Sequence, residues 1–264
     1  IARLSKDLKQ AATALSQREA RYLVNSYYQI QDYRKASASQ ERELGERQEP
    51  HATLTWLSDN MEKLEAQIAR ALDAYSASSP VGQWSRSVRG IGPVITVGLL
   101  AHIDIEKAPT VGHIWSFAGL NPLAEWKKGE RRPWNADLKV LCWKIGESFV
   151  KVCNHDDAYY GNIYQVRKEK ELERNEAGLF KDQAAAKLEK FKIGKDTDAY
   201  SWYSQGKLPP AHLHARAKRY AVKLFLAHWH EVAYRDRFKQ PPPKPYPIAM
   251  LQHTHYIAPP GLGA

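Results

Sequence analysis

Residues 84–101 read W-S-R-S-V-R-G-I-G-P-V-I-T-V-G-L-L-A, and the corner at the centre of this stretch decides the fold that we expect. Gly90 and Gly92 flank one aliphatic residue and can adopt backbone angles that are closed to other residues. Pro93 suits the first position of a new helix, where no N–H group is needed. The pattern predicts two helices joined by a tight turn, with Ile91 in the crease between them. This is the form of a helix-hairpin-helix.

The second helix of the hairpin is expected from Val94 to Ile103, and it is apolar on several sides, which predicts burial. The amides of the turn and of the first helical residues have no partner within the helix and lie at the positive end of its dipole. A phosphate group fits there. Such contacts hold a nucleic-acid backbone without reading bases. A tight corner that binds no ligand is the alternative.

Charge and composition bound the class of protein. The 264 residues include 39 basic and 29 acidic side chains, with a net charge of +10. This balance favours a polyanion partner through counterion release. The composition fits a globular protein with one large domain and an appendage, or with two domains. No apolar run reaches the length of a membrane span and no secretory signal is seen. We expect a cytoplasmic protein of a bacterial or phage-infected cell.

Residues 51–77 carry the clearest helical pattern. Their apolar residues are spaced alternately three and four apart, which forms a heptad seam. The seam predicts pairing either with a second copy of the chain or with the N-terminal helix of the same chain. The candidate dimerisation residues are Leu54, Leu57, Met61, Leu64 and Ile68.

Changes in pattern along the chain predict three domains. Residues 1–80 form a helical arm, within which residues 35–50 lose their periodicity and indicate a solvated helix end and a linker. Residues 81–240 form the helix-hairpin-helix domain. Residues 241–264 form an extended, proline-rich tail. The predicted fold class is therefore all-α.

Two basic segments support the expectation of a nucleic-acid partner. Residues 126–134 place four cations beside two tryptophans, which suits a phosphate backbone with stacking, although a solvated turn is the alternative. Residues 207–240 form a basic helix. The candidate DNA-binding residues are Arg89, Gly90, Ile91, Gly92, Pro93, Val94, Lys127, Lys128, Arg131, Arg132, Lys139, Arg216, Arg219 and Lys223.

Three H-x-H pairs raise the question of a metal site. They are His212 with His214, His228 with His230, and His253 with His255. In a helix this spacing directs the two rings to different sides, and no carboxylate stands at ligand spacing beside them. We expect no metal and no cofactor.

The order of three motifs resembles the C-terminal domain of the bridge-RNA-guided insertion-sequence transposases. The motifs are G-I-G-P-V-I-T-V-G-L-L at 90–100, F-A-G-L-N-P at 117–122 and a basic helix from about residue 131. The resemblance covers residues 84–170, a third of the chain. It implies the DNA-handling half of such an enzyme. We therefore expect DNA as the partner in preference to RNA.

The sequence departs from that family at its catalytic groups. The family has an N-terminal domain with four metal-binding acidic residues, and residues 1–80 show no counterpart. It also has a nucleophilic serine after the second motif, whereas no serine occurs between Asn121 and Glu147. We therefore expect a non-catalytic, sequence-tolerant DNA-binding protein. The first alternative is a helix-hairpin-helix DNA-processing enzyme, either glycosylase-like and using Asp104 or a transposase. The second is an assembly protein using the helical arm.

Overall fold

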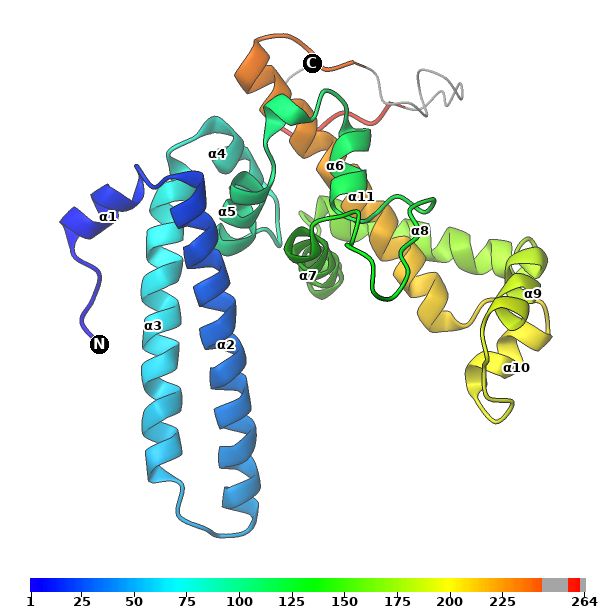
Figure 1. Ribbon diagram of the computed structural model, residues 1–264, viewed down its shortest axis with the longest axis horizontal. Helices are drawn as coiled ribbons and strands as arrows, with labels where there is room; N and C mark the ends of the chain where they lie inside the picture. Colours follow the sequence, from blue (N-terminus) through cyan, green and yellow to red (C-terminus); the bar gives the residue numbers. More distant parts are fainter. Residues whose placement is uncertain (244–255, 262–264) are drawn as a thin grey trace. The chain divides into compact units, whose positions relative to one another are not determined.

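The computed structural model describes residues 1–243 and 256–261, and every regular element in that part of the chain is helical (Figure 1). The expected all-α class is confirmed. Most of the expected tail, residues 241–264, lies outside the described residues. The helices are α1 Lys6–Ala12, α2 Gln17–Glu46, α3 Ala52–Ala77, α4 Pro80–Ser87, α5 Pro93–His102, the 3₁₀ helix η1 Ile105–Lys107, α6 Val111–Phe117, α7 Ala136–Val152, α8 Tyr159–Glu176, α9 Lys181–Lys190, α10 Asp198–Ser204 and α11 Pro210–Phe238.

The chain folds as two compact units that are interleaved along the sequence. The first contains Ile1–Ser87, Ile91–His113 and the segment that begins at Glu231. The second contains Val88–Gly90, Ile114–His230 and the described residues 256–261. The expected ranges 1–80 and 81–240 differ from this division, because the apolar helix α5 packs with the arm that precedes it in the sequence.

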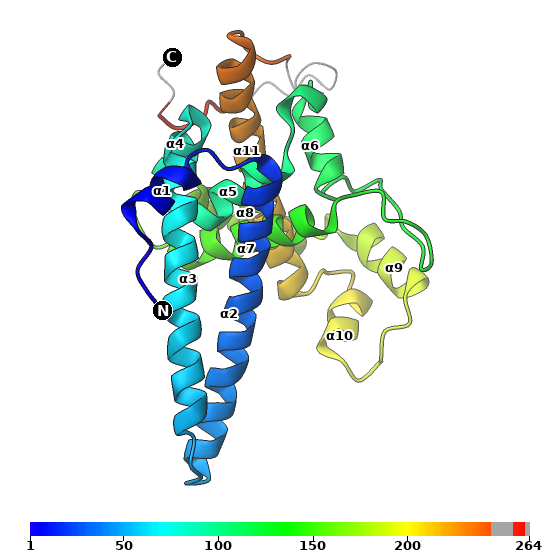
Figure 2. The ribbon, with the colours of Figure 1, turned by 60° about the vertical axis from the view of Figure 1, so that its left-hand side comes forward.

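The arm is a pair of long helices that lie side by side (Figures 1 and 2). A capping box starts α2, since the Ser16 hydroxyl accepts from the Glu19 amide and the Glu19 carboxylate accepts from the Ser16 amide at 2.8 Å. The helix then continues to Glu46, so the expected solvated helix end is confirmed and the expected linker is limited to residues 47–51. The polar composition there marks an exposed helix end, and the chain reverses in a short turn before α3.

The seam of α3 is used within the chain. The five seam residues are half-buried, and α3 packs along α2. Arg34 of α2 also pairs with Glu65 of α3 at 3.2 Å, and the carboxylate side chain is only 9% exposed. The structure thus takes the intrachain alternative. A homodimer through Leu54, Leu57, Met61, Leu64 and Ile68 stays a prediction.

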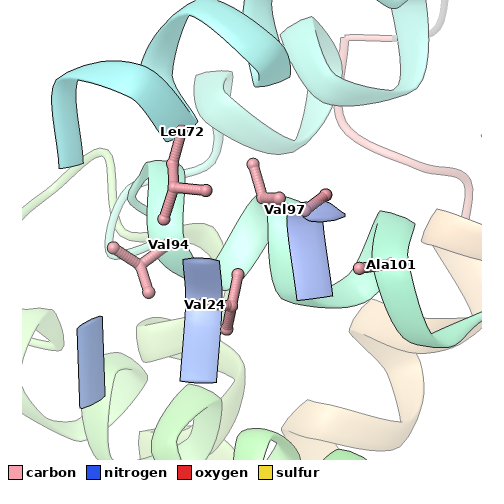
Figure 3. Packing of buried hydrophobic residues seen from close by; sticks show 6 residues of the cluster. Val24, Leu72, Val94, Val97 and Ala101 are labelled. Carbon is pink, nitrogen blue, oxygen red and sulfur yellow. The ribbon is translucent and has the colours of Figure 1, made fainter. Parts of the chain in front are cut away.

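Helix α5 completes the core of the first unit. Val94, Val97 and Ala101 of α5 are buried against Val24 of α2 and Leu72 of α3 (Figure 3). These five side chains explain why α5 is apolar on several sides, since two helices of the arm cover it. Burial of each of the valine and leucine side chains favours folding by about 1.5–3 kcal/mol.

The carboxyl end of α5 is held by side chains of α2. Arg21 donates from Nη2 to the Ala101 carbonyl at 2.6 Å, and Gln17 donates to the Leu100 carbonyl at 3.0 Å. The last carbonyls of a helix lack partners within the helix and carry its negative dipole end, so a guanidinium and an amide stabilise them.

The corner before α5 has one glycine in a left-handed conformation. Gly90 has φ +93°, as the tight turn required, and Ile91 is 4% exposed. Gly92 has φ −86° and ψ 177°, which is extended backbone open to any residue. The expectation that Gly92 adopts a conformation closed to other residues is therefore wrong. Pro93 occupies the first position of α5, as expected.

Aromatic rings form the centre of the second unit. Phe149 of α7 stacks on Tyr160 of α8 with ring centroids 5.1 Å apart, and Phe225 of α11 meets the Tyr160 ring edge-on at 5.2 Å. All three side chains are 0–1% exposed. This cluster fixes α7, α8 and α11 against one another and so determines which face of α7 points to solvent.

Candidate nucleic-acid interface

The loop between α6 and α7 is ordered by its own contacts. The Glu130 amide donates to the Lys127 carbonyl at 3.1 Å, which closes a four-residue turn. Gly129 has φ +95°, the angle that a type II turn demands at its third position. The indole N–H of Trp126 donates to the Glu130 carbonyl at 2.7 Å. The loop therefore presents its side chains from a defined backbone.

The cations of this loop point into solvent. Lys127, Lys128 and Arg131 are exposed, and none of the three side chains forms an ion pair with any described residue. The Arg132 guanidinium lies 5.2 Å from the centroid of the Trp126 ring. Glu130 is the one acidic residue between positions 126 and 132, so the loop carries an excess of three positive charges.

The basic surface continues from the loop onto α7. Asn135 caps this helix by accepting from the Leu138 amide at 2.8 Å. The Lys139 ammonium lies 4.0 Å from the centroid of the Trp134 ring. Partial burial and the charge of Arg132 lower the pKa of Lys139. The loop and the start of α7, which we call the loop–α7 surface, carry five cations against two acidic residues, Glu130 and Asp137; the cations are Lys127, Lys128, Arg131, Arg132 and Lys139.

Helix α7 adds two exposed apolar side chains to that surface. Val140 is 52% exposed and Trp143 is 60% exposed, whereas Leu141 and Ile145 are buried on the opposite side of the helix. Lys139 and Trp143 stand one turn apart and therefore share a face. Trp143 was not among the candidate residues chosen from the sequence. It lies midway between the buried residues Leu141 and Ile145 and four residues after Lys139, and this spacing indicates an outward side chain.

Arg216 does not belong to this surface. Its Nε donates to Glu171 at 2.7 Å, its Nη1 donates to Gln183 at 3.1 Å, and its guanidinium lies 4.7 Å from the Phe180 centroid. Glu171 has no exposed surface and also pairs with Arg167. The expected phosphate contact of Arg216 disagrees with this position, because a buried carboxylate already uses its donors.

Arg219 and Lys223 also differ in their surroundings. The Lys223 ammonium lies 4.2 Å from the centroid of the Trp115 ring, and the Trp115 indole donates to the Lys223 carbonyl at 3.1 Å. Burial lowers the pKa of Lys223. Arg219 is exposed and forms no ion pair with the described residues. Burial and the charge of Arg216 also lower the pKa of Arg219, and Arg219 differs from Lys223 in being more exposed.

At the corner before α5, two backbone amides are unpaired within the described structure, but the expected cation, Arg89, is engaged by a carboxylate. In the described part of the chain, the amides of Val94 and Ile95 have no acceptor, and no side chain caps α5. Arg89 pairs with Asp157 through Nε at 2.9 Å and 3.0 Å, and its hydrogen bond lowers the pKa of Asp157. The first amides of α5 are therefore unpaired among the described residues, whereas the Arg89 guanidinium is shared with a carboxylate. The side chains of Ile91 and Val94, which were expected to contact DNA, are buried in the protein instead.

Three histidines of the H-x-H pairs are hydrogen-bonded to tyrosines. Tyrosine hydroxyls are hydrogen-bonded to the Nδ1 atoms of three histidines, in the pairs Tyr203–His212 at 3.3 Å, Tyr164–His214 at 2.7 Å and Tyr160–His228 at 2.7 Å. Within residues 1–243 and 256–261, no group of three or more potential metal ligands is found. His253 and His255 lie outside these residues.

Asp104 caps the short helix η1. It accepts from the Glu106 amide at 3.1 Å and pairs with Lys107 at 3.0 Å. The hydrogen bond from Lys107 is the main cause that lowers the pKa of Asp104. A carboxylate held charged by these contacts fits a helix cap, and nothing in its geometry favours the glycosylase alternative.

No protein-family model matches the chain, and neither a curated protein nor a solved structure matches it. None of the helices described in residues 1–243 is long and apolar enough to cross a membrane.

Proposed function

We propose that this protein is a non-catalytic DNA-binding protein that holds the sugar-phosphate backbone with little regard to base sequence. The observation that carries the proposal is the loop of residues 126–132, whose four cations stand on an ordered turn with only Glu130 opposing them. Preorganised cations attract a polyanion without the entropic cost of ordering the loop on binding.

Two further cations extend the proposed footprint. Lys139 follows the loop on α7, and Arg219 stands exposed on α11. With the four cations of the loop they make six candidate phosphate contacts. If about six phosphates are neutralised, log K falls with log salt at a slope of roughly −5. The resemblance to transposase C-terminal domains supports DNA over RNA, and the proposal includes no chemical step.

The corner between α4 and α5 is proposed as a helix-hairpin-helix phosphate contact. Its support is the pair of unpaired amides, at Val94 and Ile95, at the positive end of α5. Gly92→Asp tests this contact, because an aspartate at the N-cap satisfies the same amides while its charge repels a phosphate. We expect it to weaken DNA binding without lowering the melting temperature. Tighter binding would contradict a phosphate at this corner.

The loop is tested by changing Lys127, Lys128, Arg131 and Arg132 together to glutamine. Affinity for a short DNA duplex is measured by fluorescence anisotropy between about 50 and 200 mM salt. We expect at least a tenfold loss at the lower salt concentration and a salt slope shallower by about 3 to 4 units. An RNA duplex of the same sequence serves as the comparison ligand and is expected to bind less tightly.

The matched control removes the same charge elsewhere. Lys6, Arg18, Arg42 and Lys63 of the first unit are exposed, form no ion pair with the described residues and also comprise two lysines and two arginines. Changing all four to glutamine is expected to alter the slope by less than one unit. Equal losses in both variants would show that net charge, rather than the loop, binds DNA, and a flat salt response of the unaltered protein would refute the function.

A further inference from the structure

Resting on the proposed function, we infer that Trp143 stacks on an unpaired base, so that this protein prefers DNA with single-stranded character. The inference starts from a large aromatic side chain exposed beside the cations of the loop–α7 surface. It adds a substrate class to the backbone contact proposed above.

Trp143 has no described partner that explains its position. Its side chain is 60% exposed, and no ring contact, cation contact or hydrogen bond joins it to another described residue. Val140 lies one turn before it and is 52% exposed, which adds aliphatic surface at its side. Trp143 and Val140 together present apolar surface that a ligand with a flat apolar face would cover.

The charges around Trp143 select the chemistry of that ligand. Lys139 stands one turn before Trp143 on the same face, and Arg132 is close enough to Lys139 to lower its pKa. Glu147 stands one turn after Trp143, and its carboxylate is paired with Lys218. A flat group that arrives with a negative charge alongside fits this arrangement. A nucleotide offers both, since its base provides the face and its phosphate meets the cations.

The need for stacking distinguishes single strands from duplexes. In a duplex the two faces of each base are covered by neighbouring bases, and extruding one base costs a few kcal/mol. In a single strand, a gap or a junction, unpaired bases present a free face. The phosphate contacts of the loop are common to both forms of DNA, so Trp143 supplies the difference.

The test compares Trp143→Ala with the unaltered chain on a single strand and on a duplex of equal length at one salt concentration. We expect the unaltered protein to bind the single strand more tightly. Trp143→Ala is expected to lose about 5- to 150-fold in affinity for the single strand, and less than about threefold for the duplex, with the salt slope unchanged. Trp143→Phe keeps a ring and should recover most of the affinity.

Trp56→Ala provides the matched control, because Trp56 is a 64% exposed tryptophan on a helix of the first unit. It should leave both affinities unchanged. Equal effects of Trp143→Ala on both DNA forms, or none on either, would overturn the inference. The quadruple loop variant separates this failure from that of the proposed function, since it should weaken both forms whether or not Trp143 stacks. Melting curves confirm that each variant is folded.

Discussion

Gly90 and Gly92 stand two residues apart in the corner and meet different structural demands. At Gly90 the backbone is left-handed, and an added Cβ atom would approach the Ser148 hydroxyl oxygen to 3.1 Å and a methyl group of Val152 to 3.2 Å. At Gly92 the backbone is extended, and an added Cβ atom would meet nothing within 4 Å. Similar sequence positions therefore carry different constraints.

The same substitution should have opposite effects at the two glycines. Gly90→Ser is expected to lower the free energy of unfolding by about 1–3 kcal/mol, because a non-glycine residue is strained at φ +93°. Gly92→Ser should raise it by a few tenths of a kcal/mol, because a serine at the N-cap accepts from an unpaired amide of α5. Urea denaturation of both variants measures this, and equal destabilisation would contradict the corner geometry.

Residue-level reasoning from the sequence located the corner but not its partners. The motif predicted the turn, Pro93 at the start of α5 and the burial of Ile91. It could not show that Arg89 pairs with Asp157, since the two residues are 68 positions apart. For the same reason, the basic pattern of α11 gave no sign that Glu171 engages Arg216.

At the scale of elements, one buried carboxylate joins two helices of the second unit. Glu171 of α8 has no exposed surface; it forms an ion pair with Arg167 on its own helix and accepts a hydrogen bond from Arg216 on α11. Burial raises the pKa of Glu171, but the hydrogen bond from Arg216 and the charges of Arg167 and Arg216 outweigh it, so the pKa is lowered overall. The packing of α8 on α11 therefore depends on an ionised side chain.

Glu171→Gln is expected to lower stability at neutral pH by about 1.5–3 kcal/mol, because it leaves the partly buried guanidinium groups of Arg167 and Arg216 without their counter-charge. Since the folded-state pKa lies below the ordinary glutamate pKa of 4.5, the carboxylate contributes stability above pH 4.5, and this contribution is lost as pH falls through the folded pKa. The variant should therefore lose less stability below pH 4.5 than the unaltered chain. Denaturation at several pH values measures both effects.

Glu173→Gln is the control for this change, because Glu173 is exposed on the same helix. It should change stability by no more than about 0.5 kcal/mol. If the two variants lost equal stability, the Glu171 network would not be what couples α8 to α11.

At the scale of the whole molecule, the pattern of residues 51–77 predicted a helix with a seam but not its partner. A heptad seam has the same spacing whether it packs on its own chain or on another. In the structure the seam packs on α2, whose Arg34 meets Glu65 of α3, and pairing with a second copy stays a prediction. The sequence also did not predict that the two units are interleaved. The residues of Pro93–His102 show that this helix is apolar, but not that it packs on α2 and α3, which precede it in the chain.

Ile68 tests how the arm is assembled, since it packs against the core of the first unit. Ile68→Ala is expected to lower stability by about 1–3 kcal/mol through loss of that packing.

With intrachain pairing alone, the melting temperature of the unaltered protein stays independent of protein concentration. A homodimer through residues 51–77 predicts instead a melting temperature that rises with concentration. Calorimetry over a wide concentration range distinguishes the two.

The bond from the Trp126 indole to the Glu130 carbonyl has a consequence for the kinetics of encounter. A loop that is already shaped needs no folding step after first contact. Capture should then proceed in a single phase whose bimolecular rate constant follows diffusion and electrostatic attraction. Removing that indole should slow capture more than it speeds release.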